Sequence, residues 1–135
     1  MKNPKSEIRN PNSVGGDKAE EEPKPFDLRE RTLRLSIRIL QITSSLPDTL
    51  EGQTVRRQLI RSGTSIGANV QEADGAVTRP DTRKSFVIAK KEAQETSYWL
   101  RIVDQMWGSK VGVKKDIDEI EQLVRILRSI IDRLR

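Results

Sequence analysis

Apolar residues recur every three or four positions through most of residues 26–135, and no segment alternates apolar and polar residues as a half-buried strand does. This spacing predicts four amphipathic helices, over residues 26–45, 51–77, 82–107 and 114–135. Because the connections between them are short, we expect an antiparallel, up-down-up-down four-helix bundle. The predicted fold class is therefore all-α.

The first and last predicted helices each carry two apolar rows, which is more than one bundle interior needs. The first helix has one row of Leu35, Ile39, Ile42 and Leu46 and a second of Leu33, Ile37 and Leu40. The last helix has a core row of Ile117, Ile120, Val124, Leu127, Ile131 and Leu134, beside Leu123, Ile126 and Ile130. Since surplus apolar surface marks an interface, we expect the chain to self-associate.

The second predicted helix has a core row with a weak centre. The row consists of Leu59, Gly63, Ile66, Val70, Ala73 and Val77. Residues 62–65, Ser-Gly-Thr-Ser, have poor helix propensity. Two interpretations follow: a break near Gly63, or one continuous helix whose small residues let a neighbour approach closely. A turn is expected at residues 78–81, and the third helix follows with a core row from Phe86 to Trp107.

Residues 1–25 differ in composition from the rest of the chain. They contain four of the six prolines and a Gly-Gly pair, with almost nothing to bury. Such a segment cannot offset its ordering entropy, so we expect a disordered tail ahead of one domain, residues 26–135. The chain has no apolar run long enough for a signal peptide or a membrane span, so we expect a soluble protein without a membrane partner.

Cysteine and histidine are both absent from the chain. Without cysteine there is no disulfide, thiol nucleophile or thiolate metal site, and a cytoplasmic location is expected. Without histidine the chain lacks the side chain most used for acid–base catalysis near neutral pH and the commonest metal ligand. We therefore expect no enzyme, no cofactor and no metal site.

The net charge of +5 lies wholly in residues 26–135, because the tail holds equal numbers of basic and acidic residues. A basic folded domain points to an acidic partner such as RNA or DNA, although mild basicity alone is common. The candidate nucleic-acid contacts are Arg31, Arg34, Arg38, Lys84, Lys90 and Lys91. The alternative is that these are solvated helix faces. The rings available to stack on bases are those of Tyr98, Trp99 and Trp107, and Trp107 belongs to a core row.

Glu92 and Glu95 lie beside an apolar row of the third helix, so they are expected to be paired with cations. Arg57 and Arg61 on the second helix are the candidate partners, and Asn69 and Glu72 occupy a nearby row. This polar cluster either fixes helix register or subunit pairing, or binds an anion through its cations. A carboxylate-bridged metal site is the third interpretation, and the absence of the Glu-x-x-His motif of such bundles argues against it.

Two segments carry a family resemblance. Residues 58–73 read Gln-Leu-Ile-Arg-Ser-Gly-Thr-Ser-Ile-Gly-Ala-Asn-Val-Gln-Glu-Ala, and residues 91–100 read Lys-Glu-Ala-Gln-Glu-Thr-Ser-Tyr-Trp-Leu. Together they resemble the two conserved blocks of the four-helix-bundle proteins encoded by intervening sequences of 23S ribosomal RNA genes. The similarity extends over residues 26–135.

The resemblance implies a bundle that assembles as a ring-like homopentamer. Similar proteins include accessory subunits of diversity-generating retroelements, which bind nucleic acid and a reverse transcriptase, and the family implies no catalytic activity. Matching by motif, its residues of interest are Arg61, Asn69, Glu72, Glu92 and Glu95. The expected function is a non-enzymatic, homopentameric, RNA-associated bundle. The alternative is a protein-interaction scaffold or accessory subunit without direct RNA recognition.

Overall fold

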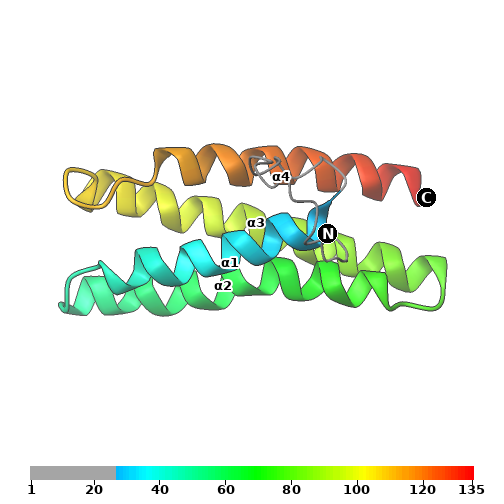
Figure 1. Cartoon of the computed structure of the whole chain (residues 1–135), viewed down its shortest axis with the longest axis horizontal. Helices are drawn as coiled ribbons and strands as arrows, with labels where there is room; N and C mark the ends of the chain where they lie inside the picture. The colour runs from blue at the N-terminus through cyan, green and yellow to red at the C-terminus, as the bar shows by residue number, and fades with distance from the viewer. Residues whose placement is uncertain (1–26) are drawn as a thin grey trace, which may run out of the picture.

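The computed structural model describes residues 27–135 as four helices joined by short connections (Figure 1). They are α1 (Leu28–Ser44), α2 (Leu50–Asp74), α3 (Arg79–Trp107) and α4 (Lys114–Arg133). Each helix packs against the next in an antiparallel manner, so the predicted all-α, up-down-up-down bundle is confirmed. The predicted disordered tail, residues 1–25, lies outside the described residues, as does the predicted start of the first helix at Phe26.

The connection between α2 and α3 begins three residues earlier than the sequence predicts. It covers residues 75–78, and Val77, which the spacing assigns to a core row, is 95% exposed within it. The reason is local: the hydroxyl of Thr78 accepts a hydrogen bond from the Asp81 amide at 3.2 Å and caps α3. Pro80 then falls in the first turn of α3, where its missing N–H costs nothing.

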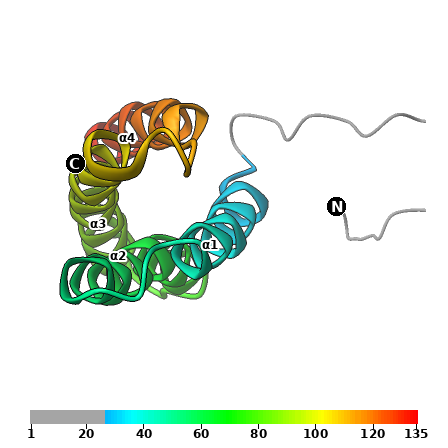
Figure 2. The same cartoon turned by 90° about the vertical axis from the view of Figure 1, so that its left-hand side faces the viewer.

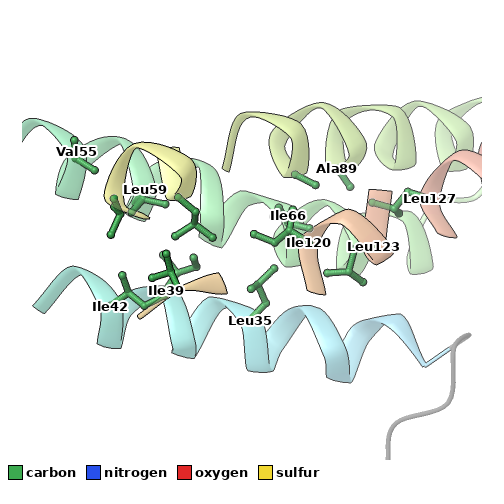
Figure 3. Packing of buried hydrophobic residues seen from close by; sticks show 14 of the residues in the cluster. Leu35, Ile39, Ile42, Val55, Leu59, Ile66, Ala89, Ile120, Leu123 and Leu127 are labelled. Carbon is green, nitrogen blue, oxygen red and sulfur yellow. The ribbon is translucent and has the colours of Figure 1, made fainter. Parts of the chain in front are cut away.

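The core takes apolar side chains from all four helices, turned toward a common interior (Figure 3). In α1 the row of Leu35, Ile39 and Ile42 is buried, and the structure thereby decides which of the two predicted rows faces inward. Leu123 of α4 is also fully buried, so its assignment to a surplus row is wrong. The interior of the bundle uses a wider face of α4 than a single row provides, because α4 meets both α3 and the more distant α1.

α2 is one continuous helix through Gly63, which decides between the two interpretations of its centre. A Cβ placed on Gly63 would lie 2.8 Å from Cγ2 of Ile39, and one on Gly67 would lie 3.1 Å from Oγ1 of Thr32. The two glycines therefore let α1 and α2 pack in close contact. They also set the register in which Ile39 faces Gly63 and Thr32 faces Gly67.

Viewed along the bundle, the helices follow one another around an arc, with α1 and α3 on opposite sides (Figure 2). The first and last helices come together less closely than successive helices do. Long side chains of α1, chiefly Arg31 and Arg38, reach across to α4. Over residues 27–135, no helix is long and apolar enough to cross a membrane.

Candidate functional site

A polar cluster joins α2 and α3, centred on Arg61. Its guanidinium donates to Glu92 Oε1 at 3.4 Å, to Glu95 Oε2, and to Gln58 Oε1 at 3.0 Å. The indole N–H of Trp99 donates to the same Glu95 Oε2 at 3.0 Å. The structure thus brings together three of the six residues that the sequence places in this cluster.

The other three predicted members lie apart from Arg61. Asn69 donates from Nδ2 to the Ser65 carbonyl of its own helix at 2.9 Å. Arg57 and Glu72 are exposed, and neither forms an ion pair with another of the residues 27–135. Arg57 lies one helical turn before Arg61 and Glu72 three turns after it, on nearly the same face of α2 but at other levels along the helix axis.

Beneath the cluster is a buried hydroxyl pair that the sequence analysis did not identify. Thr96 Oγ1 lies 2.8 Å from Ser62 Oγ and 2.8 Å from the Glu92 carbonyl oxygen of its own helix, and both hydroxyl side chains are fully buried. The sequence did carry a signal for this pair. Thr96 interrupts the apolar core row of α3, and Ser62 borders the core row of α2. Two small polar side chains satisfying each other allow α2 and α3 to approach closely without an orphaned polar group.

The predicted nucleic-acid contacts on α1 are largely engaged within the bundle. Arg31 donates to Glu119 Oε1 at 2.7 Å and Oε2 at 3.0 Å, and its side chain is only 11% exposed. Arg38 donates to Asp116 at 2.9 and 3.1 Å. The hydrogen bonds and charge of Asp116 raise the pKa of the Arg38 guanidinium above its ordinary value, against the opposing effect of burial. Arg34 pairs with Glu30 of its own helix at 3.3 Å.

The predicted contacts on α3 are placed differently. Lys84 and Lys91 are exposed and Lys90 is half-buried, and none of the three forms an ion pair with another described residue. Because α3 lies across the bundle from α1, the six candidate cations do not make one continuous surface (Figure 2). Only the α3 set remains available for an anion.

The outward side of α3 carries a row of exposed residues at helical spacing, opposite the buried row from Ala89 to Val103. We call it the α3 row; it consists of Lys84, Val87, Lys91, Gln94, Tyr98, Arg101 and Gln105. It contains three cations and no carboxylate. Tyr98 is 54% exposed, and its ring meets that of Trp99 edge-on at a centroid distance of 5.2 Å.

The outward side of α1 carries apolar residues instead. Leu33, Ile37 and Leu40, which we call the α1 row, are 54%, 49% and 47% exposed. The register of Ile39 on Gly63 brings the exposed Ile60 of α2 to the level of Leu40, so the apolar surface extends toward α2. The structure thus leaves one of the two apolar rows predicted on the first helix exposed.

Acidic side chains of the described residues do not come together as a metal site. In residues 27–135, no three metal-ligating side chains lie close enough together to hold an ion. The carboxylates that do come close to α2 or α1 are each directed at an arginine. The surface of the described residues carries a basic row on α3 and an apolar row on α1.

These features define a class: an all-α protein of four antiparallel helices, with its polar residues organised for packing and surface contact. Comparison of the sequence with known protein families identifies its family. Residues 24–133 match the 23S rRNA-intervening sequence proteins, and the chain belongs to that family.

A solved structure is similar to this chain over most of its length. It is the crystal structure of a protein of unknown function from the S23 ribosomal protein family of Bacteroides thetaiotaomicron. The two chains are 31% identical and superpose with a TM-score of 0.70, covering 77% of this chain and 97% of that one. A search of curated proteins finds no match.

Proposed function

We propose that the protein is a non-enzymatic homo-oligomer that associates with RNA, with self-association through the α1 row and RNA contact through basic helix surface. The observation that carries the proposal is the separation of the two surfaces. The residues of the apolar α1 row and of the basic α3 row are exposed, and the two helices that carry them lie on opposite sides of the bundle (Figure 2). A copy bound at one side therefore leaves the other side accessible.

The α1 row offers apolar surface that self-association would cover. Covering a half-exposed leucine or isoleucine is worth about 1 kcal/mol. Three such residues on one subunit cannot alone offset the cost of association, which is about 4 kcal/mol or more. A closed ring, in which each subunit takes part in two contacts, is the economical solution for a small patch. The family resemblance suggests five subunits.

The charge of the domain supports association with a polyanion. Five basic and five acidic residues fall in residues 1–26, so the whole excess of +5 lies in residues 27–135. An oligomer would carry the net charge of +5 once for each subunit. Proteins that neutralise phosphates release condensed counterions, and their affinity then falls steeply as salt rises.

The test measures oligomer size and RNA affinity across the same salt series. Because copies of a basic chain repel one another, added salt is expected to strengthen self-association, as followed by light scattering. RNA affinity, followed by filter binding, is expected to fall at least tenfold between about 50 and 200 mM salt. A chain that stays monomeric throughout refutes the first half of the proposal. RNA binding that is absent at low salt, or insensitive to salt, refutes the second.

A second candidate function is a protein-interaction scaffold, such as an accessory subunit of a polymerase. The α1 row favours it, because an exposed apolar row accepts a different protein as readily as a second copy. Nuclease treatment distinguishes the two candidate functions. A stable complex recovered after nuclease digestion, and lost when Ile37 becomes Glu, supports the scaffold; a complex that disappears with the nucleic acid supports RNA association.

A further inference from the structure

We infer that the α3 row is a binding surface for single-stranded nucleic acid, with Tyr98 as the platform on which an unpaired base stacks. This inference rests on the proposed function and adds to it the surface and the form of the nucleic acid. Three observations carry it: the charge of the row, the support behind the Tyr98 ring, and the shape of the surface.

The charged residues of the row are all cations, spaced along it at Lys84, Lys91 and Arg101. Lys84, Lys91 and Arg101 are exposed, and none pairs with a carboxylate of residues 27–135. The neighbouring carboxylates on α3, Glu92 and Glu95, are both engaged by Arg61 of α2. At about 1.5 Å per residue, the row extends about 32 Å, long enough for several consecutive phosphates.

The Tyr98 ring is exposed and yet supported. Its neighbour Trp99 meets it edge-on, and the indole of Trp99 is held by the carboxylate of Glu95. Glu95 is held in turn by Arg61. The α2–α3 polar cluster thus positions the ring, so stacking a base on it costs little additional side-chain entropy.

The shape of the surface favours a single strand. The α3 row lies on the outer, convex side of one helix, and an isolated ring there can stack only on a base that is not already stacked in a duplex. Gln94 and Gln105 supply amide groups that can donate to and accept from base edges. A stacking platform flanked by cations is the usual combination for binding single strands with little sequence preference.

The ring is tested with a fluorescein-labelled single-stranded RNA of mixed sequence, followed by anisotropy. Tyr98→Ala is expected to weaken binding about five- to hundredfold, the range of one lost stacked base. Tyr98→Phe keeps the ring and is expected to bind within twofold of the wild type. Equal losses in both variants would show that the hydroxyl, not the ring, makes the contact, and would overturn the stacking role.

The cations are tested by a matched pair of double variants. Lys84→Gln with Lys91→Gln removes two charges from the row, and the slope of log affinity against log salt is expected to become shallower by about 1.4. Lys110→Gln with Lys115→Gln removes two exposed charges near the start of α4 and is expected to leave the slope nearly unchanged. If the two variants behave alike, binding depends on overall charge and the α3 row is not the site.

The positioning role of Glu95 is tested by a double-variant cycle. Glu95→Ala alone is expected to weaken binding less than Tyr98→Ala does, and to add little in the Tyr98→Ala background. Circular dichroism of each variant checks that the helices remain. A full additional loss in the double variant would mean that Glu95 acts independently of the ring and would overturn the positioning role.

The outcomes separate this inference from the proposed function. If the wild type binds neither the single strand nor the same RNA annealed to its complement, both fail. If the wild type binds RNA but the Tyr98 and lysine variants match their controls, the inference alone fails. Binding to the duplex that is as tight as binding to the single strand also overturns the inference, whereas tighter binding to the single strand supports it.

Discussion

Arg31 of α1 and Glu119 of α4 form a two-point ion pair, with nitrogen–oxygen distances of 2.7 and 3.0 Å. The residues are 88 positions apart in sequence. They connect the first and last helices, which pack less closely than successive helices do. A planar guanidinium on a carboxylate fixes both distance and orientation. This pair, with Arg38 and Asp116 beside it, holds the side of the bundle between α1 and α4.

The Arg31–Glu119 pair is expected to contribute measurably to stability, because Arg31 is nearly buried. Arg31→Ala should lower the free energy of unfolding by about 1–2 kcal/mol, since Glu119 then loses its charged donor. Urea denaturation followed by circular dichroism measures the change. The control is Arg34→Ala, whose partner Glu30 is exposed on the same helix; it should cost less than about 0.5 kcal/mol. Equal effects would mean that the pair contributes no more than a surface contact.

The close packing of α1 on α2 predicts opposite outcomes for two glycine substitutions. Gly63→Ala places a methyl group 2.8 Å from Ile39 and should destabilise the bundle by about 1–3 kcal/mol, even though alanine favours a helix. Gly75→Ala meets nothing nearer than 3.9 Å and should be neutral or slightly stabilising. Thermal unfolding of the two variants measures the difference. A stabilised Gly63→Ala would show that α1 and α2 can separate without cost.

The carboxylate that joins Arg61 and Trp99 should matter more than an unpaired one on the same pair of helices. Glu95→Ala removes the acceptor of both donors and should lower the free energy of unfolding by about 1 kcal/mol. Glu72→Ala, on the exposed side of α2, should change it by less than about 0.5 kcal/mol. Chemical denaturation of both variants measures these changes in the free energy of unfolding. If they unfold alike, Glu95 is effectively solvated and positions nothing.

A charge in the α1 row should disrupt the assembly and spare the subunit. Ile37→Glu is expected to convert the oligomer to a monomer, because an interface cannot bury an unpaired carboxylate without large cost. Its helix content should be retained, since the side chain is already half-exposed in the single chain. Leu50→Glu, at the exposed start of α2, is the control and should leave the mass unchanged. A variant that keeps the wild-type mass would place the contact elsewhere.

The presence of the four helices was predictable, because a helix depends on the spacing of apolar residues along a short stretch of sequence. The row from Ala89 to Val103 repeats at the helical period and is buried as predicted, and one of the two rows predicted on the first helix, Leu35 to Leu46, is buried as well. The connection after α2 was misplaced because Val77 continues the apolar spacing, whereas the capping hydroxyl of Thr78 and the following proline decide where α3 begins. A helix cap depends on a hydrogen bond between residues three positions apart, and the spacing of apolar residues carries no information about it.

The polar cluster was predictable only in part. Glu92 and Glu95 on a half-apolar face required cations, and Arg61 supplies them. Arg57 was an equal candidate, because it lies one turn from Arg61 on the same face of α2, and spacing alone does not say which turn lies beside the two carboxylates. The actual partner depends on how α2 and α3 are aligned along their axes, and the buried contact of Ser62 with Thr96 lies beside the Arg61 pairing in that alignment.

Hydrophobic spacing alone was enough to specify four helices and their order around one core, because each helix forms from contacts within a few residues and buries its own apolar face. Tertiary packing alone decided which apolar row of α1 faces inward and which arginines are engaged. Leu33 and Leu35 have the same chemistry, yet only Leu35 is buried, and Arg31 finds its partner 88 residues away. Such choices depend on the relative rotation of whole helices, a quantity that no local pattern contains.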